Sequence, residues 1–172
     1  LERYTGTPGR LEMIDCGQDF SVLVDYAHKP DALANVLTTL REVAPRRIIL
    51  VFGCGGDRDK SKRPAMGAIA KKYSDFFILT ADNSRSERTE DIIADIEAGI
   101  GDCHHYCVQT DRALAIRMAI AQARPGDVVL IAGKGHEPYQ IMGSTIAPFD
   151  DREQARQALE ELKHAAANVT VA

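Results

Sequence analysis

The sequence has no long apolar run, no excess of basic residues and only four cysteines among 172 residues. A helix needs about 20 consecutive apolar residues to span a bilayer, and no segment approaches that length. The formal net charge is −4 and the isoelectric point is near 5.7, so the chain lacks the basic surface of a general nucleic-acid binder. The N-terminus has no charged region followed by an apolar one, which excludes a recognisable signal peptide. We therefore expect neither a membrane protein nor a nucleic-acid-binding protein.

The cysteines Cys16, Cys54, Cys103 and Cys107 are scattered along the chain. A chain of this length can bury a core without disulfides, so a reducing cytoplasm is the simplest interpretation. On a strand, Cys103, His105 and Cys107 would share one face and resemble metal ligands. Zinc sites usually add a second pair of ligands, and no second pair is apparent. We therefore expect these cysteines to be small core residues and the chain to hold no metal.

Strand and helix patterns alternate along the sequence. Strands are expected at residues 21–26, 47–52, 76–80, 104–109 and 128–132, and helices at 31–43, 64–73, 89–99, 111–123 and from Asp150 or Asp151 to about His164. Thr89 and Asp111 are expected N-caps, and a turn at Gly143 joins a hairpin of residues 139–142 and 145–149. This order predicts an α/β, Rossmann-like three-layer domain, with a mostly parallel sheet and an antiparallel edge hairpin.

The strand at residues 128–132 is entirely apolar, so we expect it in the centre of the sheet, buried on both faces. Residues 1–15 are rich in glycine and proline and are expected to form a hinge or linker, with the folded domain at 16–172. The last eight residues look like a tail. The chain begins with Leu1 and not with Met, so we expect it to be part of a longer protein.

The first chemical motif runs from Gly53 to Arg58, directly after a predicted strand. Its spacing matches neither the dinucleotide fingerprint nor the phosphate loop, but its three glycines allow a ligand to approach the backbone closely. Arg58 could bind a carboxylate through two parallel hydrogen bonds. The alternative is a tight turn in which Arg58 pairs with Asp57 or Asp59.

The second motif, Asp82 to Glu87, also follows a predicted strand. Asp82 could accept a hydrogen bond from an ammonium group, and Arg85 could bind a carboxylate; the alternative is an Asx turn with a helix cap. The carboxyl ends of the strands are where α/β sheets bind ligands. The two motifs together therefore predict a site for a ligand that carries both carboxylate and amino groups.

Two further strand ends carry polar groups. Residues 133–137 follow the most apolar strand and offer Glu137 as a partner for an amino group, although a strand-end turn with exposed charges is the alternative. Asp25 could hydrogen-bond a ribose or a cation, and His28 could pack on a base. The simpler role in that loop is that Asp31 caps the following helix. No motif matches a Ser-His-Asp triad.

Taken together, these motifs resemble the C-terminal domain of the Mur ligase family, most closely its MurE branch, the UDP-N-acetylmuramoyl-tripeptide synthetases. The resemblance extends over residues 9–162. It rests on five ordered motifs, Asp25–His28 with Pro30-Asp31, Val51–Lys60 with Lys62–Pro64, Met66–Ala70, Asp82-Asn83 with Arg85, and Gly133–Glu137 with Tyr139-Gln140.

The resemblance implies a three-domain, cytoplasmic, ATP-dependent ligase of peptidoglycan precursor synthesis. ATP would phosphorylate the D-glutamate γ-carboxylate of UDP-MurNAc-L-Ala-D-Glu, and the amino group of meso-diaminopimelate would displace the phosphate. ATP and Mg²⁺ would bind mainly to a central ATPase domain, to which residues 1–15 would be the hinge. This chain would be the third domain, inactive alone, with the N-terminal and central domains as its partners.

The resemblance also implies roles for individual residues. No catalytic residue and no metal ligand is implied in this chain. Arg85 would hold the distal carboxylate that lysine lacks. The family usually has a proline directly before this arginine, whereas this chain has Ser84 there, so the turn lacks the stiffness that proline would give it. The implied nucleotide-binding residues are Arg10, Asp25 and His28, and the implied diaminopimelate-binding residues are Arg58, Asp82, Asn83, Ser84, Arg85, Gly133 and Glu137.

Two alternatives remain open at this point. One is another ligase of the same superfamily, adding lysine or acting as a cyanophycin- or folylpolyglutamate-type enzyme. Arg85 disfavours lysine, and the Asp82-Asn83-x-Arg85 motif disfavours the other two. The second alternative is a non-catalytic module that binds an amino acid or a nucleotide.

Overall fold

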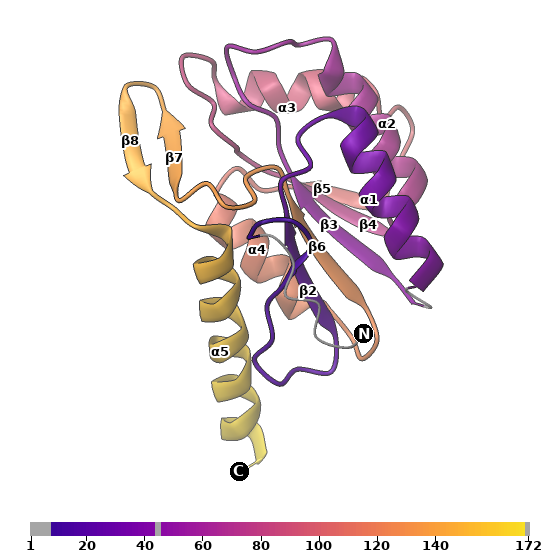
Figure 1. Ribbon diagram of the computed structural model, residues 1–172, viewed down its shortest axis with the longest axis vertical. Helices are drawn as coiled ribbons and strands as arrows, with labels where there is room; N and C mark the ends of the chain where they lie inside the picture. Colours follow the sequence, from indigo (N-terminus) through magenta and orange to yellow (C-terminus); the bar gives the residue numbers. More distant parts are fainter. Residues whose placement is uncertain (1–7, 44–45, 171–172) are drawn as a thin grey trace.

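The computed structural model describes residues 8–43 and 46–170 of the chain (Figure 1). Within these residues, the main sheet has the strand order β1-β2-β6-β3-β4-β5. Only β1 runs antiparallel to its neighbour. The strands are β1 (Glu12–Met13), β2 (Ser21–Asp25), β3 (Ile48–Phe52), β4 (Phe76–Leu79), β5 (Tyr106–Val108) and β6 (Val128–Ala132).

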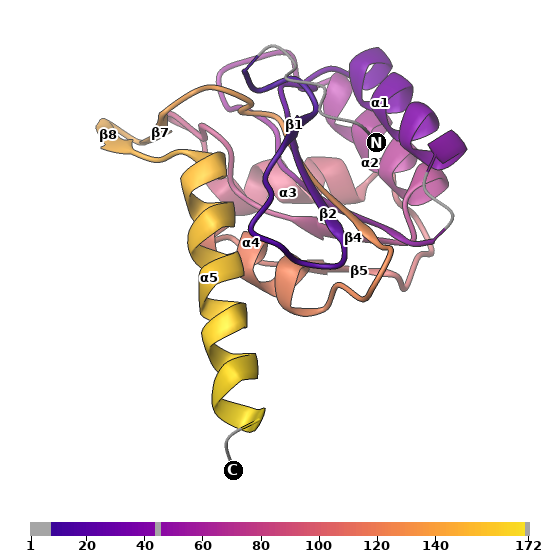
Figure 2. The same ribbon diagram turned by 60° about the horizontal axis from the view of Figure 1, so that its bottom comes forward.

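The helices cover both faces of this sheet (Figures 1 and 2). On one face, α1 (Pro30–Val43), α2 (Lys62–Tyr73) and α3 (Thr89–Glu97) enclose an apolar core. On the other face, α4 (Arg112–Ala121) and α5 (Asp151–Thr170) enclose a second core. The predicted three-layer α/β fold is therefore confirmed.

The apolar strand β6 lies between β2 and β3 and is buried along its whole length. Leu130, for example, pairs with Leu23 on one side and with Leu50 on the other. Its predicted central position is confirmed. The loop that follows β6 consequently emerges between the loops that follow β2 and β3.

The predicted hairpin forms from β7 (Tyr139–Met142) and β8 (Thr145–Pro148), but it is a separate two-stranded sheet. It projects from the body of the domain (Figure 1). The antiparallel edge of the main sheet is β1 instead. An isolated bridge from Met142 to Arg85 joins the hairpin to the loop after β4, so this loop, and not an edge strand, is its partner.

The chain ends and caps differ from expectation in three places. Helix α5 continues to Thr170, so most of the expected tail is helical, as its run of alanines, the strongest helix former, favours. The expected hinge contains β1 at Glu12–Met13, while residues 1–7 lie outside the described residues. Helix α3 has Arg88, not Thr89, at its N-cap, whereas Asp111 caps α4 as predicted, accepting from the Leu114 N–H at 3.1 Å.

Cys103 and Cys107 do not share a face. Strand β5 begins only at Tyr106, so the alternation expected from residue 104 does not extend back to Cys103. Cys103 packs against the core under α1 to α3, and Cys107 packs against the core under α4 and α5. Among the described residues, no helix has the length and apolarity needed to cross a membrane.

Candidate functional site

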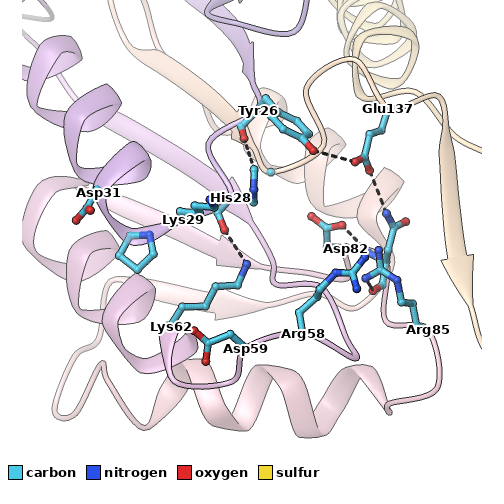
Figure 3. A pocket seen from close by; sticks show the side chains of 14 residues that line it. Tyr26, His28, Lys29, Asp31, Arg58, Asp59, Lys62, Asp82, Arg85 and Glu137 are labelled. Carbon is cyan, nitrogen blue, oxygen red and sulfur yellow. Dashed lines mark hydrogen bonds between the residues drawn. The ribbon is translucent and has the colours of Figure 1, made fainter.

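A cavity of about 560 Å³ opens at the carboxyl ends of β2, β6, β3 and β4 (Figure 3). Each of these strands contributes the loop that follows it, because parallel strands end at the same edge of the sheet. The lining residues are Tyr26, His28, Lys29, Pro30, Asp31, Gly55, Arg58, Asp59, Lys62, Asp82, Asn83, Arg85, Gly133 and Glu137.

This cavity brings together most of the residues singled out in the sequence. From the expected amino-acid site it includes all but Ser84, and from the expected nucleotide site it includes His28. Ser84 is buried, and its carbonyl accepts a hydrogen bond from the Glu87 N–H at 3.1 Å. Arg10 is exposed and does not line the cavity.

Asp25 lies at the end of β2 and is also absent from the cavity lining. One carboxylate oxygen accepts from the Leu11 N–H at 2.8 Å, and the other accepts from the Ala27 N–H at 2.7 Å. The side chain therefore ties the segment before β1 to the loop that carries His28. It shapes the edge of the cavity instead of pointing into it.

Two carboxylates form the acidic side of the cavity. The Asn83 amide donates to Glu137 Oε2 at 3.0 Å, and the Tyr26 hydroxyl donates to Glu137 Oε1 at 3.4 Å. Burial and the nearby Glu137 carboxylate raise the pKa of Tyr26. Asp82 is 8% exposed and accepts from the Asn83 N–H at 2.6 Å. These groups provide oriented acceptors for an ammonium group.

Gly133 is required by the packing of Asp82. A Cβ at position 133 would lie 2.8 Å from Asp82 Oδ2, closer than side chains tolerate. The backbone φ of Gly133 is +118°, a conformation that L side chains rarely adopt. The glycine therefore lets the strand end approach the carboxylate directly.

Two guanidinium groups form the basic side. Arg85 donates from Nη1 to the carbonyls of Gly56 at 2.9 Å and Asn83 at 3.2 Å. Its backbone N–H donates to the Ile141 carbonyl at 3.1 Å, so the hairpin fixes its position. Within the described residues its Nε and Nη2 have no hydrogen-bond partner, which leaves them available to a ligand. Arg58 is exposed, and among the described residues its guanidinium hydrogen-bonds only the backbone carbonyl of Asp57, at 3.4 Å.

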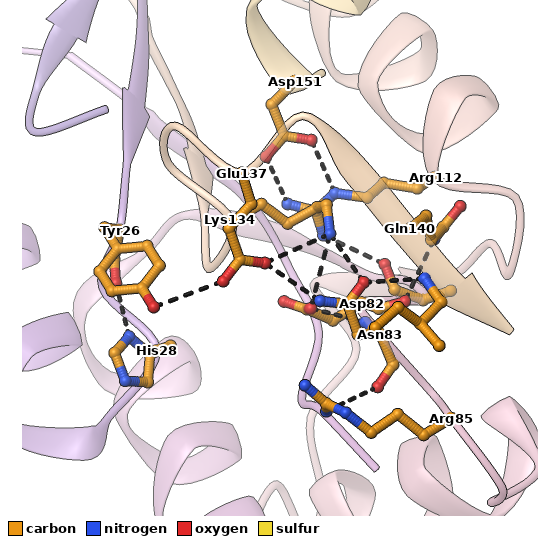
Figure 4. A network of polar contacts seen from close by, with 12 residues as sticks. Tyr26, His28, Asp82, Asn83, Arg85, Arg112, Lys134, Glu137, Gln140 and Asp151 are labelled. Atoms are coloured by element: carbon orange, nitrogen blue, oxygen red, sulfur yellow. Dashed lines mark hydrogen bonds and ion pairs between the residues drawn. The ribbon is translucent and has the colours of Figure 1, made fainter. Parts of the chain in front are cut away.

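Two buried cations that the sequence analysis did not predict lie behind this cavity (Figure 4). The Lys134 side chain is fully buried, and its amine donates to Asn83 Oδ1 at 3.0 Å. Arg112 and Asp151 form a fully buried pair with two contacts of 2.8 Å. The only local signal for Lys134 was its place between two glycines after an apolar strand.

A third buried cation, Arg63 on α2, holds the cavity loops together. It binds both Glu87 oxygens, at 2.9 and 3.0 Å, the Asp95 carboxylate at 2.8 Å and the Gly55 carbonyl at 3.2 Å. These contacts join the loop after β3 to the loop after β4. The hydrogen bonds from Arg63, then that from Lys60, hold the pKa of Glu87 well below its ordinary range.

We predict that Glu87→Gln lowers stability at neutral pH but has little effect in acid. A carboxyl whose pKa is depressed by folding contributes stability above its unfolded pKa of about 4.3, and this contribution is lost as pH falls towards the folded pKa. Urea unfolding between pH 7 and pH 2 should show the two stability curves converging below about pH 4. Glu90→Gln, which removes a carboxylate from the exposed pair with Arg88 at the start of α3, is the matched control. A pH-independent gap would contradict the prediction.

The described residues contain no group of three or more His, Cys, Asp or Glu side chains arranged to hold a metal ion. The sulfur of Cys103 lies 3.4 Å from His105 Nδ1, but these two side chains are not part of a larger cluster of His, Cys, Asp or Glu among the described residues. The expectation that Cys103 and Cys107 bind no zinc remains a prediction.

Comparisons with known proteins place this geometry in context. A family model described as "Mur ligase, glutamate ligase domain" matches residues 9–135. The UDP-N-acetylmuramoyl-L-alanyl-D-glutamate–2,6-diaminopimelate ligase of Syntrophomonas wolfei is 56% identical over 161 residues, which are 92% of this chain and 33% of that protein. The ligase of the same name from Geobacillus kaustophilus is 54% identical over 155 residues, 90% of this chain and 32% of that protein. The chain thus spans about one third of these relatives.

Solved structures agree with these sequence comparisons. A structure named as a UDP-N-acetylmuramoyl-L-alanyl-D-glutamate–2,6-diaminopimelate ligase has a TM-score of 0.87 and 43% identity, and the match covers 94% of this chain and 33% of that one. A folylpolyglutamate synthase/dihydrofolate synthase from Yersinia pestis has a TM-score of 0.60 at 17% identity, with 92% of this chain and 32% of that chain covered, and shares the fold alone. The motifs, the fold and the family model agree, and this chain belongs to the Mur ligase family, within its glutamate ligase domain.

Proposed function

We propose that this chain is the amino-acid-binding domain of an ATP-dependent ligase that adds meso-diaminopimelate to UDP-MurNAc-L-Ala-D-Glu. The observation that carries the proposal is the charge pattern of the cavity. Arg58 and Arg85 face it from one side, and Asp82 and Glu137 face it from the other. Diaminopimelate carries two carboxylates and two amino groups, so it complements this arrangement.

The residues of the cavity would bind and orient the incoming amino acid. Arg85 would hold the distal carboxylate, while Asp82 and Glu137 accept hydrogen bonds from the adjacent ammonium group. The second amino group, near Arg58, would remain free to attack. ATP would supply the phosphoryl group that activates the D-glutamate γ-carboxylate. The neutral amino group would attack the acyl carbon and lose a proton to solvent, and the amide bond would form as phosphate leaves with the electrons of the broken C–O bond. The chain's contribution is positioning, which lowers the entropic cost of bringing two substrates together.

The nucleotide would meet this domain at Arg10, Asp25 and His28. The His28 ring lies 4.6 Å from the Tyr26 ring, between centroids, and its Nδ1 lies 2.9 Å from the Tyr26 carbonyl. The two rings meet edge to face, at 60°, and these contacts would hold the His28 ring as a surface against which a base could pack. Asp25 would act mainly by holding this surface in place, through its backbone hydrogen bonds.

ATP and Mg²⁺ would bind mainly to the central domain of the complete ligase, with UDP-MurNAc-dipeptide between the domains. Residues 1–15 would form the hinge to that domain, with Glu12–Met13 pairing as β1 with the main sheet. We place the reaction in the cytoplasm, in the synthesis of peptidoglycan precursors.

The complete ligase and the 172-residue chain provide the test. We expect the complete ligase to form ADP and the tripeptide product only with diaminopimelate and UDP-MurNAc-dipeptide present. The chain alone should fold but neither hydrolyse ATP nor form product, and should bind ATP weakly. Turnover by the chain alone would refute the division of labour between domains. A complete protein that binds diaminopimelate without turnover would favour a non-catalytic binding module.

A further inference from the structure

Lys134 is fully buried behind the cavity and does not line it. Its ammonium group lies 3.0 Å from Asn83 Oδ1, 3.7 Å from Glu137 Oε2 and 3.9 Å from Asp82 Oδ1. It also lies 5.7 Å from the centre of the Tyr139 ring. Lys134 therefore contacts from behind the same three polar side chains that face the cavity (Figure 4).

These contacts fix the orientation of the Asn83 amide. A lysine ammonium group can only donate hydrogen bonds, so the atom that faces Lys134 must be the Asn83 oxygen. The Ile141 N–H donates to the same oxygen at 3.0 Å. The NH₂ end is consequently turned towards Glu137, to which it donates at 3.0 Å. One of its two hydrogens makes that bond, and the other remains for a ligand carboxylate.

Lys134 also sets the charge of the acidic side. Asp82 and Glu137 contribute two negative charges against the single positive charge of Lys134. The nearby pair of Arg112 and Asp151 is neutral as a unit. Within this group of three side chains one negative charge is therefore left uncompensated, and it faces the guanidinium groups of Arg58 and Arg85 across the cavity. A ligand ammonium group placed there would neutralise the cluster, whereas a ligand without this group would leave it unbalanced.

We propose that Lys134 is a positioning residue for diaminopimelate, which orients the Asn83 amide and leaves the Asp82–Glu137 pair one cation short. This inference rests on the proposed function of the cavity. On this inference, the preference for ligands with an ammonium group over ligands without one depends on Lys134, a residue that does not contact the ligand. Burial lowers the pKa of Lys134, and the carboxylates of Asp82 and Glu137 act in the opposite direction.

The test uses the complete ligase with Lys134→Met, which keeps an unbranched side chain of similar length and removes the charge and the donors. We expect KM for diaminopimelate to rise about 10- to 100-fold, because the Asn83 amide loses the charged donor that fixes its orientation. This loss should exceed the extra attraction that the ligand ammonium group gains from the uncompensated carboxylates of Asp82 and Glu137. KM for ATP and for UDP-MurNAc-dipeptide should change less than about twofold, and so should kcat. Lys134→Gln keeps a donor for Asn83 but no charge, and should give an intermediate KM.

Lys71→Met is the matched control. Lys71 donates to the carbonyls of Ile100 at 2.8 Å and Asp102 at 3.0 Å, and none of these three residues lines the cavity. Its loss should lower the melting temperature without changing KM for diaminopimelate. If Lys134→Met behaves in the same way, Lys134 is merely structural and the proposal is overturned. A wild-type ligase that does not use diaminopimelate would instead overturn the proposed function.

A measurement on the unmodified chain covers the case in which the Lys134 variants do not fold. Nitrogen-15 NMR of the wild-type chain should show a Lys134 ammonium signal protected from exchange. Saturation with diaminopimelate should shift both this signal and the side-chain amide of Asn83. Pimelate, which has the two carboxylates but no amino group, should shift neither at the same concentration. Binding of diaminopimelate with both signals unmoved would overturn the proposal.

Discussion

Replacing Arg85 by alanine should lower kcat/KM for diaminopimelate about 30- to 1000-fold in the complete ligase, equivalent to about 2–4 kcal/mol. The guanidinium is held at the cavity by the carbonyls of Gly56 and Asn83, and its Nε and Nη2 have no partner among the described residues. These two nitrogens can bind a carboxylate through parallel hydrogen bonds. Lysine has no distal carboxylate, so its much lower kcat/KM should change far less.

Arg58→Ala is the comparison that separates recognition from structure. Arg58 is exposed, and its guanidinium makes one hydrogen bond within the part of the chain that the structure describes, to the Asp57 carbonyl at 3.4 Å, so its removal should disturb the loops little. If Arg58 binds the carboxylate common to both amino acids, kcat/KM should fall equally for diaminopimelate and lysine. Equal losses on both substrates in Arg85→Ala would instead show that Arg85 acts by holding the loops at Gly56 and Asn83.

The largest loss of stability should follow from Asp151→Ala. The carboxylate is fully buried against Arg112, which also donates to the carbonyls of Ala81 at 3.1 Å and Ala132 at 3.0 Å. Removing Asp151 leaves a buried guanidinium without its counter-charge, and such a change costs about 3–5 kcal/mol. Chemical denaturation of the chain should show this as a shifted midpoint.

Two controls accompany Asp151→Ala. Arg117 and Glu161 pair across the same two helices at 3.2 Å, but their side chains are 44% and 60% exposed. Glu161→Ala should therefore cost less than about 1 kcal/mol. The double variant Arg112→Met with Asp151→Leu should recover stability relative to Asp151→Ala, because it leaves no buried charge. A double variant less stable than Asp151→Ala would contradict this account.

The fold and most of the cavity were predictable because they depend on regular patterns. Alternating strands and helices define a parallel sheet, and the sheet brings its strand ends together, so the motifs at Arg58, Asp82 and Glu137 had to meet. Lys134 and Arg112 were not predictable in this way. Their partners lie 51 and 39 residues away in the sequence, and a lysine or arginine is usually exposed.

Other differences arose where local signals were weak or incomplete. The hairpin was correct as a hairpin, but nothing in its residues indicated that Met142 would bridge to Arg85 and not join the main sheet. The prediction that Cys103 and Cys107 share one face of a strand was wrong, because strand β5 covers only Tyr106–Val108. In these cases the final position depends on tertiary contacts and not on the pattern of the segment itself.

The backbone at Arg85 limits how this pocket can be altered. Its φ is +52°, in the left-handed region that favours glycine and asparagine, and the Gly143 N–H holds its carbonyl at 2.7 Å. A valine or isoleucine there would add backbone strain to the loss of the guanidinium. Asparagine or glycine would relieve strain while removing the same charge. Few substitutions at position 85 are therefore free of backbone strain, and those that relieve it also remove the hydrogen bonds that Arg85 donates to the carbonyls of Gly56 and Asn83.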